Sequence, residues 1–196
     1  MRKISADLAL ILLALAGYCL PWVVSTGASM TMNAYDLAEW SSLHPDVRAS
    51  APTLLTTFAL RVLLVCIGTV IVFSPTLVSR WLRVALALLI AAALLPPFEF
   101  FSAGLNDPNY RQQFSLSVAM LGVGAIALIN RLMRLRVFVQ LAALGVGLIL
   151  SIGAIMSSYS LLAGFDLARQ IGSGVIIFVV SVVVCGVVVI KRGNFA

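Results

Sequence analysis

The segment that decides the fold reads LLPPFEFF and occupies residues 94–101. Pro96-Pro97 must interrupt a helix here, because proline has no amide hydrogen and its ring clashes with the preceding turn. A helix over residues 81–95 rises only about 22 Å, which is short of a hydrocarbon core of about 30 Å. We therefore expect a helix over 81–101 that is broken at Pro96-Pro97. Residues 98–101 either complete a membrane span or leave the helix broken at depth.

The composition of the chain indicates that this helix belongs to a membrane protein. The chain has 196 residues, of which 62% are hydrophobic and 10% charged, with a mean hydropathy of +1.11. Soluble domains carry about 25% charged residues. Several apolar runs approach the length that a transmembrane helix needs, and no polar stretch is long enough for a second domain. We predict a single membrane domain.

The apolar runs predict an all-α polytopic protein with six transmembrane helices arranged as three hairpins. The first run follows a basic start like that of a signal peptide, but it continues to Val24, so we expect an uncleaved helix. Its Leu-Pro-Trp end and residues 33–37 resemble uncharacterised bacterial multi-pass proteins, a likeness that implies no function. The predicted spans are 5–24, 53–73, 81–101, 113–132, 137–157 and 171–190, with an outer loop at 25–52 and another loop at 102–112.

The basic residues predict the orientation of these spans, because cytoplasmic loops carry an excess of Lys and Arg. On the outer side we expect only Arg48, Arg111 and Arg169. The side of the N-terminus collects Arg2, Lys3, Arg80, Arg83, Arg131, Arg134, Arg136, Lys191 and Arg192. Both termini are therefore expected in the cytoplasm, and the protein in a bacterial inner membrane. Because most of the net charge of +6 follows membrane topology, we expect no nucleic-acid partner.

The residue types also restrict cofactor chemistry. His44 is the only histidine, and no CxxCH motif is present, so neither bis-histidine haem b nor covalent haem c is expected within this chain. The three cysteines, Cys19, Cys66 and Cys185, all lie in apolar runs without CxxC spacing, where thiols behave as small hydrophobes. We therefore expect no metal site, whereas a bound quinone or lipid stays open.

Small residues indicate where helices approach closely, because lipid supplies no hydrophobic drive for helices to associate. Ala143, Gly147 and Ser151 recur every four residues on the fifth predicted helix. Gly122 and Gly124 lie on the fourth. We predict a seam between these two helices, and further close contacts at the glycines of the sixth helix, which are Gly172, Gly174 and Gly186.

Arg61 is the charged residue that the sequence places inside a span, so it is the first candidate for function. Glu99 is expected near the same outer level, and an Arg61–Glu99 pair would neutralise both charges. Alternatively, Arg61 extends to the outer headgroups, about 10 Å away along the helix axis. Phe98, Phe100 and Phe101 surround Glu99 and are candidates for lining a quinone or lipid site. Arg131, Arg134 and Arg136 are candidates for binding anionic lipid headgroups.

Three functions remain open at this level. The first is a non-catalytic subunit that packs within a larger membrane complex, with an electron-transfer complex as one host, and it is favoured because no catalytic motif is found. The second is a small transporter or channel component that uses Arg61 and Glu99 and acts as a homo-oligomer. The third is a quinone- or lipid-binding protein. The expected partners are the lipid bilayer and other membrane subunits.

Overall fold

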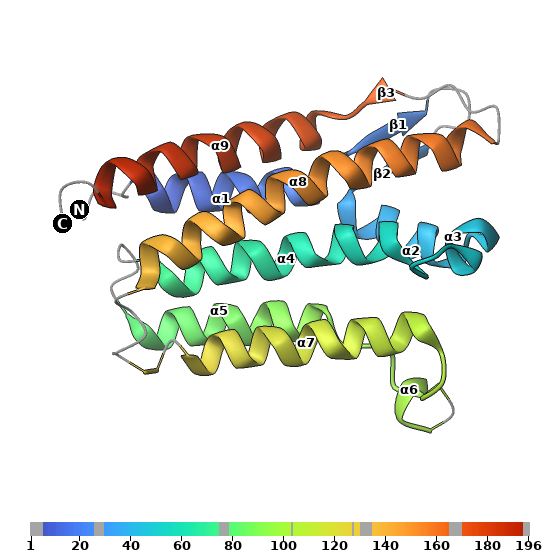
Figure 1. Ribbon diagram of the computed structural model, residues 1–196, viewed down its shortest axis with the longest axis horizontal. Coiled ribbons are helices and arrows are strands. Elements are labelled where there is room, and N and C mark those ends of the chain that lie inside the picture. The colour runs from blue at the N-terminus through green and yellow to red at the C-terminus, as the bar shows by residue number, and fades with distance from the viewer. Residues whose placement is uncertain are drawn as a thin grey trace.

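The protein is described by a computed structural model that covers residues 6–25, 30–74, 79–102, 104–126, 128–129, 135–164 and 170–193. Within these residues it is mostly helical, as predicted (Figure 1). The long helices are α1 (Ala6–Cys19), α4 (Leu55–Phe73), α5 (Arg80–Ala93), α7 (Pro108–Ile126), α8 (Arg136–Ala163) and α9 (Ser173–Gly193). The short elements are β1 (Val23–Ser25), β2 (Met30–Met32), α2 (Ala34–Leu43), α3 (Pro45–Ala49), α6 (Glu99–Ser102) and β3 (Gln170–Ile171).

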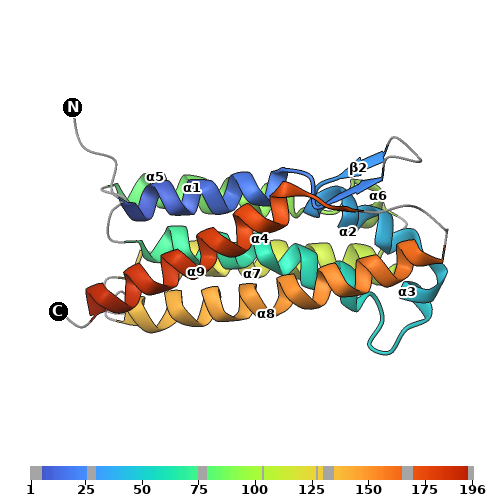
Figure 2. The same ribbon diagram turned by 90° about the horizontal axis from the view of Figure 1, so that it is seen from above.

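Helix α4 lies at the centre of the bundle. It packs against α8 on one side and α5 and α7 on another, while α1 and α2 also contact it. The remaining close pairs are α1 with α9, α5 with α7, and α8 with α9. The long helices run roughly along one axis, and Figures 1 and 2 show that α1 begins and α9 ends at the same end of the bundle. The short elements α2, α3 and α6 and the strands gather at the opposite end, which we call the cap end.

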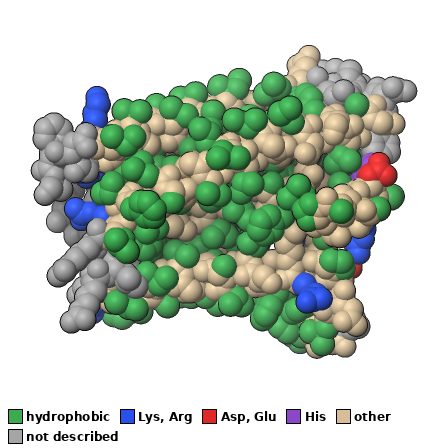
Figure 3. Space-filling view, in the orientation of Figure 1, with side chains coloured by type: hydrophobic (Ala, Val, Ile, Leu, Met, Phe, Trp, Pro, Cys, Tyr) green, Lys and Arg blue, Asp and Glu red, His purple; other side chains and the backbone are tan. Residues whose placement is uncertain are grey.

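Three of the described helices are long and apolar enough to cross a membrane. These are α4, α8 and the Ser173–Arg192 part of α9, while the Leu8–Cys19 part of α1 is a shorter apolar helix. On the face seen in Figure 3, hydrophobic side chains cover most of the length of the bundle, and charged side chains lie toward its two ends. This distribution is the one expected of a protein surrounded by lipid along its length, and it supports membrane association.

The interruption predicted at Pro96-Pro97 is present. Helix α5 ends at Ala93, and the short α6 begins at Glu99. Between them the chain has no helical structure, because neither proline can donate a backbone hydrogen bond. The third predicted span of 81–101 is therefore two helices rather than one.

The end of the first predicted span, at residue 24, was wrong. Helix α1 ends at Cys19, and residues 23–25 form strand β1, which pairs with β2 and β3 in a small antiparallel sheet of order β2-β1-β3. The turn at Pro21-Trp22 is bound to α9: the amides of Gly172 and Gly174 donate to the carbonyls of Trp22 and Pro21. Pro21 cannot extend the helix hydrogen bonds, so the chain instead connects α1 to the start of α9.

Glycines allow α1 and α9 to approach closely. A Cβ atom at Gly17 would lie 2.6 Å from the Phe178 backbone nitrogen, and one at Gly174 would meet the Gly17 carbonyl oxygen at 2.8 Å. Trp22 fills the space beside this crossing, donating from Nε1 to the Gly17 carbonyl and packing on the Phe178 ring. The predicted close contacts at Gly172 and Gly174 are confirmed, whereas Gly186 has open space around it.

Other predicted boundaries also differ from the structure. The loop predicted at 102–112 is shorter, because α7 begins at Pro108, where the missing amide hydrogen costs little. Asp107 caps it by accepting from the Asn109 amide. The outer loop predicted at 25–52 contains β2, α2 and α3, with Asn33 accepting from two amides at the start of α2. Helix α8 extends to Ala163, beyond the predicted end at 157.

Candidate functional site

Arg61 lies near the cap end of α4, and its side chain is only 1% exposed. Its guanidinium is held by three other side chains. Nη2 donates to Glu39 Oε1 on α2 at 2.7 Å, and Nη1 donates to Asn109 Oδ1 on α7 at 2.6 Å. Nη1 also lies 3.3 Å from Gln112 Oε1. The arginine therefore connects three helices, and its charge is compensated by one carboxylate.

The partners of Arg61 are bonded to one another and to the backbone. Gln113 Nε2 donates to the same Glu39 oxygen at 3.0 Å, and Gln112 Nε2 donates to the Leu54 carbonyl at 3.3 Å. We call Arg61, Glu39, Asn109, Gln112 and Gln113 the arginine network. Because every member is hydrogen-bonded to at least one other, the network joins α2, α4 and α7 where the three helices meet.

Further polar groups surround the arginine network. Ser41 on α2 and Thr57 on α4 share a 3.0 Å hydrogen bond, one turn of α4 away from Arg61. The Tyr18 hydroxyl is buried within electrostatic range of Arg61. Tyr35, in the first turn of α2, is partly buried, and this burial together with the Glu39 charge raises the pKa of its hydroxyl. The junction is therefore polar, although most of α4 below it is packed in apolar surroundings.

A second ion pair fixes α3 to the start of α7. Arg48 Nη2 lies 2.9 Å from Asp107 Oδ2, and Arg48 Nη1 donates to the Ser42 carbonyl. Burial alone would raise the pKa of Asp107. Hydrogen bonds from Arg48 and the Asn109 amide, together with the Arg48 charge, outweigh that effect and lower the pKa. The pair marks the polar rim of the cap end.

The structure does not bring Arg61 and Glu99 together. Among the described residues, the ion pair of Arg61 is with Glu39, and Glu99 is exposed on α6. Arg61 does not extend to the surface either, because its guanidinium is buried. The position of Glu39 on the inner side of α2 is the physical reason, since it supplies a nearer carboxylate than α6 does.

The phenylalanines beside Glu99 form a ring cluster with Phe114 of α7. The Phe100 ring lies 5.2 Å from Phe114 and 5.1 Å from Phe101. Phe100 is buried, whereas Phe98 and Phe101 are exposed. The cluster therefore presents its outer rings at the surface of the protein.

The predicted seam between the fourth and fifth helices is not formed; each packs on a different partner. A Cβ at Gly147 of α8 would lie 3.6 Å from Cys66 Cβ of α4, and one at Gly124 of α7 would lie 3.1 Å from Ala87 of α5. Ser151 is fully buried on the same face of α8, and Ala143 packs against the core, whereas Gly122 faces open space. Small residues therefore mark close approach, but α4 and α5 are the partners.

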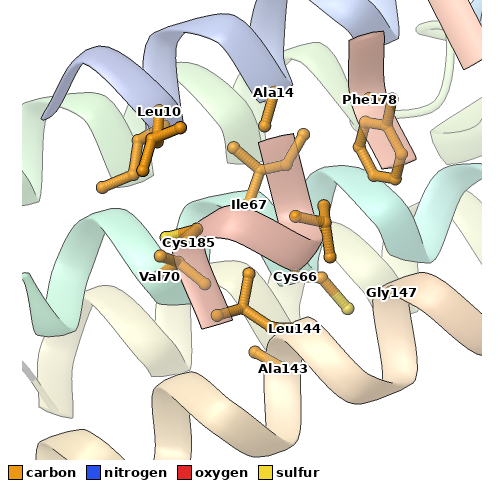
Figure 4. A pocket seen from close by; sticks show the side chains of 12 residues that line it. Leu10, Ala14, Cys66, Ile67, Val70, Ala143, Leu144, Gly147, Phe178 and Cys185 are labelled. Carbon is orange, nitrogen blue, oxygen red and sulfur yellow. The ribbon is translucent and has the colours of Figure 1, made fainter. Parts of the chain in front are cut away.

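An apolar cavity of about 20 Å³ lies beside Gly147. Cys66 of α4, Cys185 of α9 and Ala143 of α8 contribute to its wall (Figure 4). A volume of this size accommodates about one water molecule, and the wall is apolar. It offers no room for a quinone ring.

The remaining candidates lie at the two ends of the bundle. Arg136 is the first residue of α8, while Arg131 and Arg134 lie outside the described residues. His44 joins α2 to α3, and its Nδ1 accepts from the Asp46 amide at 3.3 Å. Within the described part of the chain, no group of three His, Cys, Asp or Glu side chains is placed to hold a metal ion.

Sequence reasoning identified Arg61 but missed Glu39, Asn109, Gln112 and Gln113. A signal for the last three was present, because Asn109, Gln112 and Gln113 recur at the i, i+3, i+4 spacing of one helix face directly after Pro108. In comparisons with known proteins, no family model, no curated protein and no solved structure matches this chain.

Proposed function

We propose that this protein is a non-catalytic integral-membrane subunit that packs within a larger membrane complex and stabilises it. The observation that carries the proposal is the arginine network. A charge at membrane depth is costly and usually serves transport or catalysis unless it is compensated. Here the guanidinium of Arg61 is bound by side chains of α2 and α7, so its role is to hold the cap end of the bundle together.

In this proposal six helices cross the membrane: α1, α4, α5 continued by α6, α7, α8 and α9. Both termini lie on the cytoplasmic side, in keeping with the excess of Lys and Arg expected there. The described basic residues support this orientation. Arg48 and Arg111 lie at the cap end, and the opposite end carries Arg80, Arg83, Arg136, Lys191 and Arg192. Arg136 then faces anionic headgroups.

A surface groove between α8 and α9 gives the proposal a place to be tested. Its lining is apolar and includes Gly145 and Gly186, and a Cβ added at either glycine meets no atom within 4 Å. A side chain introduced at these positions therefore points into open space without disturbing the bundle. Glycines on an exposed helix face permit close approach of another helix.

The experiment places a photo-crosslinking amino acid at Gly145 or Gly186 in the native membrane. The matched control is Leu89, an exposed residue of α5 on another side of the bundle. We expect one discrete crosslinked product from the groove positions, containing a polypeptide other than this chain. If neither groove position nor the control crosslinks to any protein, the subunit proposal is contradicted.

A further inference from the structure

The ring cluster at α6 is held in a fixed arrangement although its outer rings are exposed. Phe100 is 5% exposed and packs between the Phe101 and Phe114 rings. Phe98 lies 6.3 Å from Phe101, and these two rings are 83% and 54% exposed. Two exposed aromatic rings on a buried aromatic base form an apolar surface. Transfer of that surface into an apolar environment is favourable, because each ring then loses contact with water.

Backbone hydrogen bonds hold the turn of α6 that carries the rings. The amides of Phe100 and Phe101 donate to the carbonyls of Pro97 and Phe98, so the turn forms directly after the two prolines. The Gly104 amide then donates to the Glu99 carbonyl at 2.9 Å and closes the segment. A Cβ at Gly104 would lie 3.0 Å from Phe100 Cα, so the closing residue is packed against the turn. These bonds fix the backbone of the turn that carries the Phe98 and Phe101 rings.

The depth of the cluster follows from its contact with α7. Phe114 lies seven residues after Asp107, which is paired with Arg48 at the polar rim. At the rise of an α-helix this places the ring cluster about 10 Å below the rim along the bundle. With the polar rim among the headgroups, that level is the boundary between headgroups and acyl chains, where the Phe and Leu side chains of interfacial helices insert.

The surface around the rings is continuous with the apolar flank of the bundle. Leu95 before α6 and Leu105 after it are both exposed, and Val118 continues the apolar face one turn below Phe114. Figure 1 shows α6 projecting sideways from the α5–α7 pair, and the corresponding corner of Figure 3 shows hydrophobic side chains beside a Lys or Arg side chain. The patch thus adjoins a surface that lipid covers if the bundle spans a membrane.

We propose that α6 is an interfacial anchor, with the Phe98 and Phe101 rings inserted at the headgroup–acyl boundary of the outer leaflet. The inference rests on the proposed placement of the bundle in a membrane. This placement accounts for the break between α5 and α6. Helix α5 is too short to span the bilayer, and α6 anchors the outer end of α5 in the interface.

The test measures how deeply a spin label at position 98 lies in the bilayer. The protein carries Cys19→Ser, which removes the exposed thiol, and Phe98→Cys, and it is reconstituted in phosphatidylcholine vesicles. Collision with oxygen reports lipid exposure, and collision with a water-soluble nickel chelate reports water exposure. Two matched positions calibrate the scale: Leu43→Cys, an exposed apolar residue of the cap end on α2, and Ile149→Cys, exposed on the flank of α8.

We expect the label at position 98 to collide with the nickel chelate several-fold less often than the label at position 43. If it is as accessible to nickel as position 43 while position 149 is lipid-exposed, the anchor is overturned and the membrane placement stands. If it is shielded from both reagents, a protein surface covers α6 and the anchor is also overturned. If position 149 is itself accessible to nickel, the membrane placement fails and the anchor with it. Retained protection of the buried Cys185 thiol shows that each labelled protein is folded.

Discussion

Replacing Glu39 with glutamine is the perturbation that examines the arginine network most closely. Glutamine keeps the shape of the side chain and an oxygen that can accept from Arg61, but it removes the compensating charge. The Arg61 guanidinium is 1% exposed, so it cannot recover its hydration without moving. The variant therefore leaves a buried cation with neutral acceptors only, namely the introduced amide oxygen and those of Asn109 and Gln112.

The expected loss of stability depends on how deeply each charged group of the Arg61–Glu39 pair is buried. Removing one partner of a fully buried ion pair costs about 3–5 kcal/mol. The Glu39 side chain is 40% exposed, so solvent already screens part of the attraction. We therefore expect a loss of about 2 kcal/mol in the free energy of unfolding, near the value of a hydrogen bond to a charged group. For a chain of this length, that corresponds to a fall of about 4–8 °C in the unfolding midpoint.

The assay follows reaction of the buried Cys185 thiol during heating in nanodiscs. Glu99→Gln is the matched control, because Glu99 is exposed outside the network, and surface substitutions change stability by about 0.5 kcal/mol or less. Combining Glu39→Gln with Arg61→Met removes both charges and should recover most of the loss. An unchanged midpoint for Glu39→Gln, or a larger loss for Glu99→Gln, would refute the reasoning.

Three further predictions concern packing, pH and thiol exposure. Gly17→Ala should lower the unfolding midpoint, because overpacking against the Phe178 backbone costs about 1–3 kcal/mol. Gly186 lies in open space, so Gly186→Ala should leave the midpoint unchanged or raise it through the better helix propensity of alanine. Asp107→Asn should destabilise by less than about 1 kcal/mol at neutral pH, because the pair with Arg48 is partly exposed. Since the pKa of Asp107 is lowered in the folded protein, its contribution is present above the ordinary aspartate pKa and disappears as the pH falls through the lowered value, so unfolding curves of the two proteins should converge in acid. A membrane-permeant maleimide should modify Cys19 before Cys185, and equal rates would contradict the assigned burial.

The sequence is informative where a local rule acts within one segment. Two adjacent prolines must end a helix, so the break after α5 was predicted from residues 96 and 97 alone. The position of Arg61 within an apolar run was equally local. The glycines at 172 and 174 also indicated close contact correctly, because a residue without a side chain in an apolar helix usually marks a crossing.

The predictions that failed concern which residues and which helices contact one another in the folded protein. Glu39 precedes Arg61 by 22 positions, and the two meet only because the cap segment folds back over α4. Glu99 was considered as the partner of Arg61 and Glu39 was missed, because the positions of α2 and α6 relative to α4 are not visible in a local pattern. The glycine at 147 indicated a close approach but not the identity of the helix opposite, which is α4 rather than α7. Pairing of helices is set by the whole bundle, which a single sequence pattern does not specify.

The native mass of the protein tests the central claim most directly. The chain would be extracted from its native membrane into nanodiscs with the least possible detergent, and its mass and polypeptide composition measured together. The subunit proposal predicts a particle that contains at least one other polypeptide in a fixed ratio to this chain. A particle that contains one or two copies of this 20.9 kDa chain and no other protein would contradict it.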